Sequence, residues 1–324
     1  MVIRTLAILI VVLADLFALC GQDISEQKKA VAFVFGTVHP RNPDGSQMRT
    51  PAGMPLAIEQ PLGTAFFVYY PDSRGGPDYG FMYLVTAKHV LKDADGGFLK
   101  EIKLRVNLND GKRSEFITSL PVSDINGNLA WFHDANEAVD VATMPLLPDQ
   151  KTVDFKAIPV AMFVDDATIT TQKVAEGDAL YFIGLMTQYY GNNKNYPVVR
   201  RGTLALMTDE QIETPTGSQN AFIAELASWP GNSGSPVFLS LSGLRRGSLM
   251  MGTNLKFLGI LSGSFLNKFK GTLLEATVIE GNELNTGISF IVPAARVKAV
   301  LDSPAAQASR DIQIQRIRKQ PVQE

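Results

Sequence analysis

Three short segments of the sequence carry side chains that together could perform nucleophilic catalysis. His89 follows a hydrophobic run, Asp140 enters an apolar run, and Ser233 lies in a glycine-containing turn. A serine hydroxyl is a poor nucleophile at neutral pH unless a base takes its proton during attack. Histidine has the pKa best suited to that task, and a carboxylate on its other ring nitrogen fixes the tautomer and stabilises the imidazolium that forms.

The glycines around Ser233 indicate a place where an oxyanion could be stabilised. Gly231 and Gly234 can adopt backbone torsions that a β-carbon resists, so amide N–H groups can converge on one point. We predict that the amides of Gly231 and Ser233 are these donors. A donor of this kind contributes about 3–4 kcal/mol to transition-state stabilisation.

The order of these residues along the chain separates the types of serine hydrolase. All three histidines, His39, His89 and His133, precede Ser233. The α/β-hydrolase order, in which the histidine follows the serine, is therefore excluded for this serine. A subtilisin-like order needs an aspartate before His89 and a parallel α/β sheet, and the helical segments of such a sheet are missing from the sequence. The order histidine, aspartate, serine remains.

Short β-type runs dominate the chain after residue 30. They are rich in Val, Ile, Phe, Tyr and Leu and are bounded by clusters of Gly, Pro, Asn and Asp. The expected strands are 31–38, 64–70, 81–86, 102–106, 158–164, 179–185, 198–207, 221–226, 235–239, 255–261, 272–278 and 287–292. Many short strands with few helical periods between them predict an all-β sandwich or barrel. The clearest helix is expected over Ala294–Leu301, and the polar residues from Ser303 onward are expected to be disordered.

The composition is that of one large globular domain or two of ordinary size. The 324 residues are 45% hydrophobic, 19% charged and 9% aromatic, with a formal net charge of −2. A charge so close to zero provides no general attraction for nucleic acid or acidic lipid, so neither is expected as a partner. One cysteine cannot form an internal disulfide, and one cysteine with three histidines makes a zinc site on these ligands unexpected.

Residues 1–20 have the pattern of a cleaved export signal. Arg4 precedes the unbroken apolar run Leu6–Leu13, and Ala18-Leu19-Cys20 offers small residues at the positions that a signal peptidase inspects. Asp15 leaves the stretch shorter than the roughly 20 apolar residues that a membrane-spanning helix needs.

We therefore expect a periplasmic or secreted protein whose mature chain begins near Gly21. The main alternative is a lipoprotein acylated on Cys20, which the bulky Leu19 disfavours. An uncleaved, buried N-terminal helix is the third possibility.

The three chemical segments, in this order, resemble the trypsin/chymotrypsin superfamily of serine proteases. Thr86-Ala87-Lys88-His89 matches its T-A-x-H motif, Asp140-Val141-Ala142 its D-[IV]-A, and Gly231 to Pro236 its G-D-S-G-G-P. The separations of 51 residues from histidine to aspartate and 93 from aspartate to serine suit the family. Residues 62–68, 176–184 with 199–202, and 287–293 resemble its disulfide-poor bacterial branch, which includes the high-temperature-requirement proteases.

This resemblance implies an all-β fold of two antiparallel six-stranded barrels with a short C-terminal helix. Residues 21–168 would form the first barrel and residues 169–302 the second, with a disordered tail over 303–324. The active site would lie in the cleft between the barrels. No PDZ domain fits after residue 301, so the peptide-sensing behaviour of high-temperature-requirement proteases is not expected.

The resemblance also implies the reaction, which is endoproteolysis of a protein or peptide substrate through an acyl-enzyme. Ser233 would attack, His89 would act as base and then acid, and Asp140 would orient the histidine, with no metal or organic cofactor. Asn232 stands where zymogen-activated relatives carry an aspartate that pairs with a newly cut N-terminus. The activation salt bridge of those relatives is therefore not expected.

The substrate-binding positions of the family fall on four residues. Ala227 corresponds to the floor of the specificity pocket, and Ser262, Gly263 and Ser264 correspond to the strand beside the substrate. Because no acidic residue lies at the pocket floor, we expect no preference for Lys or Arg. A small or medium apolar residue before the scissile bond is expected instead.

Two alternatives belong to other classes. The chain could be a binding protein on the protease fold that turns over little or nothing. It could also be an esterase that uses the same residues. Taken alone, each of the three segments is typical of a loop, a buried ring or a strand end, and only their combination in this order indicates catalysis.

Overall fold

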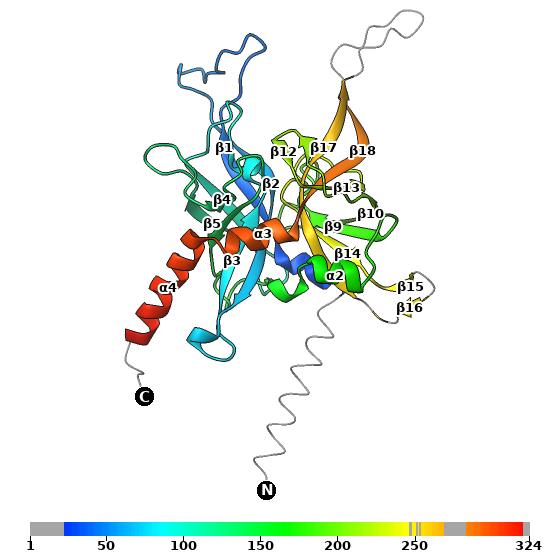
Figure 1. Ribbon diagram of the computed structural model, residues 1–324. Coiled ribbons are helices and arrows are strands. Elements are labelled where there is room, and N and C mark those ends of the chain that lie inside the picture. Colours follow the sequence, from blue (N-terminus) through cyan, green and yellow to red (C-terminus); the bar gives the residue numbers. More distant parts are fainter. Residues whose placement is uncertain (1–22, 246–247, 251, 253, 269–282, 320–324) are drawn as a thin grey trace, which may run out of the picture.

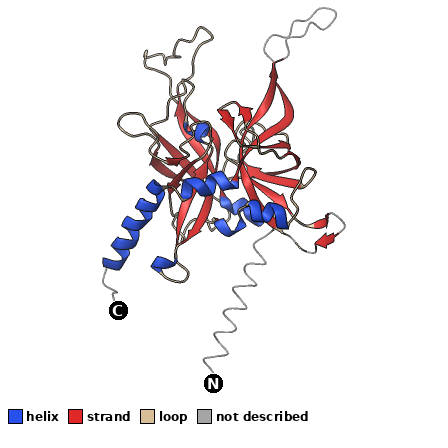
Figure 2. Cartoon of the chain, viewed as in Figure 1, coloured by secondary structure: helices blue, strands red, loops and turns tan. Residues whose placement is uncertain are grey.

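Two β-structured units lie side by side in the computed structural model, which describes residues 23–245, 248–250, 252, 254–268 and 283–319 (Figure 1). Strands dominate both units, and the few helices lie outside the sheets (Figure 2). The prediction of an all-β fold is confirmed.

The N-terminal unit is an eight-stranded sheet. Seven strands follow the order β5-β4-β1-β2-β3-β7-β6, and β8 pairs in parallel with β2. The strands are β1 (Val31–Val38), β2 (Ile58–Pro71), β3 (Gly80–Thr86), β4 (Glu101–Asn107), β5 (Ser114–Pro121), β6 (Phe132–His133), β7 (Ala142–Pro145) and β8 (Ile158–Pro159). The unit therefore has two more strands than the six predicted. Strand β8 lies within the predicted run 158–164, whereas β5, β6 and β7 were not predicted. Strand β5 is mostly exposed and β6 has two residues, so neither forms a long apolar run in the sequence.

The C-terminal unit is the predicted closed six-stranded barrel, with the order β10-β13-β18-β17-β14-β9. Its strands are β9 (Ala179–Gly184), β10 (Val198–Leu206), β13 (Phe222–Glu225), β14 (Pro236–Ser240), β17 (Leu255–Lys268) and β18 (Glu283–Pro293). Two hairpins extend from it: β11 (Ile212–Thr214) with β12 (Gly217–Gln219), and β15 (Gly243–Arg245) with β16 (Ser248–Met250). The strand expected at 272–278 lies outside the described residues.

The connection between the units contains short helices. The 3-10 turn η4 (Val160–Met162) follows β8, and helix α2 (Asp166–Thr171) precedes β9. The Asp165 side chain caps α2 by accepting a hydrogen bond from Thr168 N at 2.7 Å. The domain boundary predicted between residues 168 and 169 falls inside this helix.

One hydrophobic cluster spans both units, and a second one lies within the C-terminal barrel. Phe66 on β2 and Phe257 on β17 are both fully buried, and their ring centroids lie 5.3 Å apart. Phe163, from the connection, packs against Phe257 at 4.7 Å. Aromatic pairs at such distances contribute about 0.5–1.5 kcal/mol beyond the area they bury. The packing fixes the units against each other, so loops from both can build one site.

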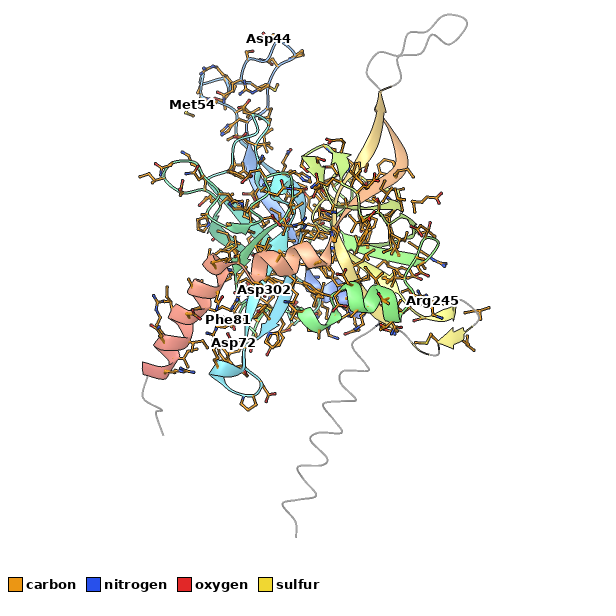
Figure 3. The ribbon with its side chains drawn as sticks, viewed as in Figure 1. Asp44, Met54, Asp72, Phe81, Arg245 and Asp302 are labelled. Atoms are coloured by element: carbon orange, nitrogen blue, oxygen red, sulfur yellow. The ribbon has the colours of Figure 1, made fainter. Side chains whose placement is uncertain are left out.

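The loops and hairpins at one end of the molecule extend well beyond the sheets. The loop between β1 and β2 projects outward, with Asp44 and Met54 toward its outer end (Figure 3). The ribbon formed by β17 and β18 projects beside it from the other unit (Figure 1).

The C-terminal segment corrects one prediction. The short helix α3 (Ala294–Leu301) was expected, but the polar tail after it forms a second helix, α4 (Pro304–Lys319), instead of being disordered. The side chains of Ala306, Arg310 and Ile314 recur every four residues and are buried against the N-terminal unit. The tail is folded because this single stripe has partners, although its average polarity is high.

Arg310 is the main anchor of α4. The residue is 4% exposed, and its guanidinium donates hydrogen bonds to the Tyr83 hydroxyl at 3.0 Å and to Leu301 O at 2.7 Å. It also stacks 4.3 Å from the ring centroid of Tyr70. The Tyr70 hydroxyl in turn donates to Asp302, which lies between α3 and α4 (Figure 3).

Replacing Arg310 by methionine is expected to destabilise the fold by about 1.5–3 kcal/mol, because charge-assisted hydrogen bonds of this strength are lost and the buried Tyr83 hydroxyl loses a partner. Chemical denaturation measures the change, with Arg316→Met on the exposed face of α4 as the matched control. An unchanged free energy of unfolding in Arg310→Met would contradict this account.

Among the described residues, no helix combines the length and the apolar character needed to cross a lipid bilayer. The export signal expected over residues 1–20 lies outside the described residues, so it stays a prediction.

Candidate active site

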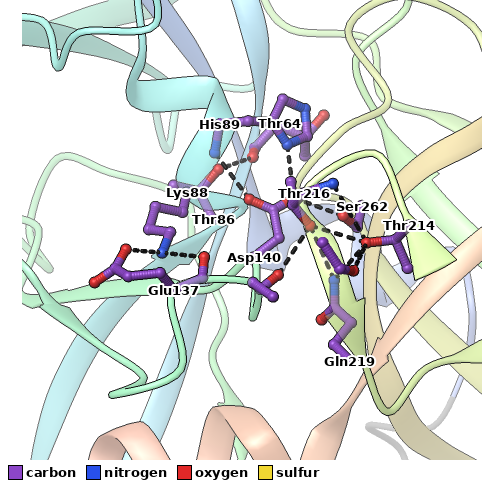
Figure 4. A network of polar contacts seen from close by, with 12 residues as sticks. Thr64, Thr86, Lys88, His89, Glu137, Asp140, Thr214, Thr216, Gln219 and Ser262 are labelled. Atoms are coloured by element: carbon purple, nitrogen blue, oxygen red, sulfur yellow. Dashed lines mark hydrogen bonds and ion pairs between the residues drawn. The ribbon is translucent and has the colours of Figure 1, made fainter. Parts of the chain in front are cut away.

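The pairing of β3 with β7 brings His89 next to Asp140. Thr86, the last residue of β3, pairs with Ala142, the first of β7. His89 lies three residues beyond Thr86 in the 3-10 turn η3 (Lys88–Leu91), and Asp140 lies two residues before Ala142. The ring Nδ1 of His89 lies 2.6 Å from Asp140 Oδ2, and the His89 backbone N–H donates to Oδ1 at 2.9 Å (Figure 4).

Asp140 is fully buried, yet its carboxylate is well supplied with donors. The Ser262 hydroxyl, from β17 of the other unit, donates to Oδ2 at 2.6 Å in addition to the two contacts from His89. Burial raises the pKa of Asp140, but the charge of His89 and the hydrogen bonds from His89 and Ser262 outweigh it and lower that pKa. The group is therefore a carboxylate at neutral pH.

The loop that carries Asp140 is held from both units (Figure 4). Lys88 Nζ, almost completely buried, donates to the carbonyl and the carboxylate of Glu137 at 2.8 and 2.7 Å. On the opposite side, the Thr216 hydroxyl of the β11–β12 hairpin donates to Ala138 O at 2.8 Å. These contacts fix the loop two and three residues before the carboxylate.

Ser233 is positioned by the edge of β2. Thr64 N donates to Ser233 O at 2.9 Å, and Gly234 N donates to Leu261 O at 2.8 Å. A β-carbon on Gly234 would lie 2.0 Å from Thr64 O and 3.2 Å from Ala87 N, and the φ of Gly234 is +84°. Only glycine fits this approach. Ser233 is thereby packed beside the chain two residues before His89.

The backbone of Ser233 lies near that of His89, but the two side chains are not bonded to each other. Within the described part of the chain, no hydrogen bond joins Ser233 Oγ to the imidazole. Ser233 is half-buried and the His89 side chain is 37% exposed. In ligand-free active sites such contacts are often long and tighten only when substrate binds.

The turn before Ser233 leaves two amides free. Asn232 N donates to Trp229 O at 2.9 Å and Gly231 has φ +94°, which together define a type II turn with Pro230 and Gly231 at its centre. Among the described residues, neither Gly231 N–H nor Ser233 N–H donates to a protein acceptor. These are the two amides predicted as oxyanion donors.

The Asn232 side chain ties this turn to the barrel. It is buried, its carbonyl accepts from Trp229 N at 2.6 Å, and its amide donates to Leu185 O. The Thr64 hydroxyl adds a second tie, because it donates to Gly231 O at 2.9 Å and accepts from Leu185 N at 2.8 Å. Hydrogen bonds to backbone groups of the barrel therefore hold the turn in place. Among the described residues, Asn232 makes no contact with a charged group.

Replacing Asn232 by alanine is expected to lower kcat about 10²–10³-fold, the loss seen when an oxyanion donor is removed, because Gly231 is no longer held in place. Asn232→Asp is the matched variant. It keeps the acceptor for Trp229 N but places a carboxylate against Leu185 O, so it should also lose activity. A kcat within threefold of wild type in folded Asn232→Ala would contradict this role.

The predicted substrate strand has a free edge. β14 pairs with residues 255–260 of β17, and β18 pairs with 259–268, so no described strand covers the other edge from Ser262 onward. Ser262, Gly263 and Ser264 lie on this stretch. Ala227 is exposed, and its carbonyl accepts from Arg200 Nη1 at 3.0 Å. Ala227 is thus on the surface, and its place at the floor of a specificity pocket stays a prediction.

The sequence analysis did not identify three residues that lie around the candidate active site. Thr64 bridges the two units, Lys88 is buried, and Trp229 is half-exposed under Arg200, 5.9 Å from the ring centroid. A polar threonine in the apolar run 62–68 was the only available signal for Thr64, and it does not show what its hydroxyl bonds.

The pKa of His89 predicts how activity depends on pH. Burial lowers this pKa, but the charge and hydrogen bond of Asp140 outweigh burial, so the pKa is raised above its ordinary value. A base with a raised pKa stays protonated to higher pH. We expect kcat/KM to rise with pH through an apparent pKa above about 6.5. A profile flat between about pH 5 and 8 would exclude His89 as the base.

The described residues contain no group of three or more His, Cys, Asp and Glu side chains that could hold a metal ion.

Comparison with known proteins gives similarity in structure alone. No family model and no curated protein matches the sequence. Among solved structures, the HtrA-type protease AlgW with a decapeptide is 19% identical, with a TM-score of 0.44 over 87% of this chain and 67% of that chain. The apo MamO protease domain from Magnetospirillum magneticum is 15% identical, with a TM-score of 0.43 over 85% of this chain and 97% of that chain. Both likenesses are of the fold alone.

Proposed function

We propose that the protein is a serine endopeptidase that hydrolyses peptide bonds through an acyl-enzyme. The observation that carries this proposal is the pairing of His89 with the buried Asp140, beside a turn in which the amides of Gly231 and Ser233 donate to no acceptor among the described residues. A base with its orienting carboxylate, a hydroxyl and two convergent donors are the parts that acyl transfer needs.

In the proposed mechanism, Ser233 Oγ attacks the carbonyl carbon of the scissile bond while His89 Nε2 takes its proton. The carbonyl oxygen becomes an oxyanion, which the amides of Gly231 and Ser233 stabilise. His89 then gives the proton to the leaving amine, and the acyl group stays on Ser233. A water molecule, deprotonated by His89, releases the acyl group and restores the serine hydroxyl. Asp140 stabilises the imidazolium in both halves of the reaction.

The free edge of β17 supplies a place for the peptide backbone. An extended segment can add to residues 262–264 as a further strand, with main-chain hydrogen bonds to the edge. This docking would bring the carbonyl to be attacked to Ser233, because Gly234 N bonds Leu261 O directly before the edge begins.

A second function is favoured by one observation. Because Ser233 Oγ makes no hydrogen bond to His89 within the described residues, a protein that binds peptides with little or no turnover fits the same site. An esterase would use the same groups.

A fluorophosphonate probe separates these functions. Labelling of the wild type at a single site, lost in Ser233→Ala, supports the enzyme, and no labelling of folded wild-type protein supports the binding protein. Single-turnover rates on matched peptide and ester substrates then separate a peptidase from an esterase.

We also propose that this reaction takes place outside the cytoplasm, in the periplasm or after secretion. The support is the export-signal pattern of residues 1–20.

A further inference from the structure

A cavity of about 290 Å³ lies where the two units meet, and none of the described residues that line it belongs to the candidate active site. One side is formed by the 3-10 turn η1 (Glu26–Ala30), by strands β1, β2 and β4 and by the loop before β8, all of the N-terminal unit. The other side is the segment 194–197, which leads into β10 of the C-terminal unit. Small-molecule sites begin at about this volume, so the cavity has room for a small ligand.

One buried polar atom in the lining of this cavity has no partner. Asn195 is 3% exposed, its Nδ2 donates to Arg105 O at 2.7 Å, and its backbone N–H donates to Asn107 Oδ1 at 2.7 Å. Because the carbonyl of Arg105 can only accept, the orientation of the Asn195 amide is fixed, and Oδ1 is the atom left over. Asn195 Oδ1 is buried and accepts no hydrogen bond from the described residues. Buried acceptors almost always have a donor, so a donor from outside the chain is expected here.

The cavity also has an excess of positive charge. Its described lining contains three lysines, Lys28, Lys29 and Lys194, and one acidic residue, Asp154. Asp154 pairs with Lys29 at 3.1 Å. Lys194 Nζ donates to a backbone carbonyl, and Lys28 is exposed; within the described ranges neither pairs with a carboxylate. Two ammonium groups are therefore left for an anion.

The remaining wall is largely apolar. Val31 and Phe67 are 7% and 1% exposed, and the ring of Phe155 packs 5.3 Å from that of Phe67. Tyr196 and Pro197 line the cavity from the other unit. An apolar group placed between these side chains is removed from water, which favours its binding.

We propose that this cavity binds a small carboxylate that carries an apolar group and an N–H donor next to the carboxylate. The carboxylate pairs with Lys28 and Lys194, the N–H donates to Asn195 Oδ1, and the apolar group lies against Phe67 and Phe155. A free N-acyl amino acid has these three features, and so does the last residue of a peptide chain. The proposal does not depend on the proposed function, because no catalytic step is involved.

Binding should also stabilise the packing of the two units, because the cavity is lined by both. A ligand that binds only the folded protein raises its unfolding temperature.

The test titrates N-acetyl-L-phenylalanine into the full chain, by calorimetry and by thermal unfolding. We expect saturable binding and a higher unfolding temperature. Three analogues each lack one feature: N-acetyl-L-phenylalaninamide lacks the charge, O-acetyl-L-phenyllactate lacks the N–H, and N-acetylglycine lacks the apolar group. Each should bind at least about 10-fold more weakly, because each leaves one part of the cavity without its partner.

Lys28→Glu tests whether binding occurs at this cavity and not at Ser233. The substitution places a like charge beside the carboxylate and should raise Kd at least about 10-fold. Lys100→Glu is the matched control, because Lys100 is exposed and does not line the cavity. Ser233→Ala should bind as tightly as the wild type, so the result does not depend on turnover.

The peptide acetyl-Gly-Gly-Phe distinguishes the two sources of the ligand. Binding as tight as that of the free acid means that a peptide end is admitted, and binding at least about 10-fold weaker means that the site takes free acids only. Either result, together with binding of the free acid, supports the site. Absence of saturable binding to the wild type, equal binding of the amide or of the phenyllactate, or an unchanged Kd in Lys28→Glu overturns the proposal.

Discussion

Replacing Ser233 by alanine is expected to lower kcat by about 10⁶-fold, the loss found when the nucleophile of a serine protease is removed. The change deletes one oxygen and leaves the surrounding backbone in place, because Ser233 is held through its carbonyl by Thr64 N at 2.9 Å. A residual rate about 10³–10⁴-fold above that in water should remain, because the amides of Gly231 and Ser233 still stabilise the oxyanion. The measurement is kcat on a peptide substrate, with fluorophosphonate labelling as the second readout.

Ser235→Ala is the matched control for this variant. Ser235 lies two residues further on and is fully buried, and its hydroxyl has no hydrogen-bond partner within the described residues. The control should retain probe labelling. If Ser233→Ala kept more than about one per cent of the wild-type kcat, Ser233 could not be the nucleophile. Removal of a nucleophile lowers kcat far more than removal of a hydroxyl with any other role.

Asp140→Asn is expected to lower kcat by about 10⁴-fold, the loss found when the aspartate of a serine protease triad is replaced by asparagine. The amide has nearly the shape of the carboxylate, so its oxygen can stay at the Oδ1 position and accept from the His89 backbone N–H, while the Ser262 hydroxyl can accept from the amide nitrogen at the Oδ2 position. The amide nitrogen, however, would donate to His89 Nδ1 and place the ring proton on Nε2. An imidazole in that tautomer cannot accept the proton of Ser233.

The pH profile shows whether Asp140 acts through His89 or only through the fold. The negative charge of Asp140 raises the pKa of His89, so removing that charge should lower this pKa. The acidic limb of kcat/KM should then move to lower pH in Asp140→Asn. A lower kcat with an unmoved acidic limb would mean that Asp140 only supports the structure. Ser262→Ala removes one donor to the same carboxylate and should have a much smaller effect.

The C-terminal tail was predicted to be disordered because its average polarity is high, and this prediction was wrong for residues 304–319. Ala306, Arg310 and Ile314 form a stripe at every fourth residue, as an amphipathic helix requires. The stripe was missed because its central member is an arginine, which counts as polar in any average. In the structure, the arginine is buried by hydrogen bonds to Tyr83 and Leu301 and by the ring of Tyr70. A polar residue can anchor a helix when its partners are present.

The sequence by itself determined the features that depend on local geometry. Pro230-Gly231 specifies a type II turn because proline presets one torsion and glycine permits the positive one. The short runs rich in Val, Ile, Phe, Tyr and Leu, with turn residues between them, indicated the all-β fold. The types and the order of His89, Asp140 and Ser233 indicated one class of chemistry.

Only the tertiary structure decided which distant groups meet. The hydrogen bonds from Thr64 to Gly231, from Ser262 to Asp140 and from Arg310 to Tyr83 join residues 167, 122 and 227 positions apart. Hydrophobic periodicity in the sequence does not predict such contacts, because they depend on how the two sheets pack through Phe66 and Phe257. The hydroxyl contact between Ser228 and Ser264 is of the same kind, because it forms only where the segment before Ser233 lies against β17.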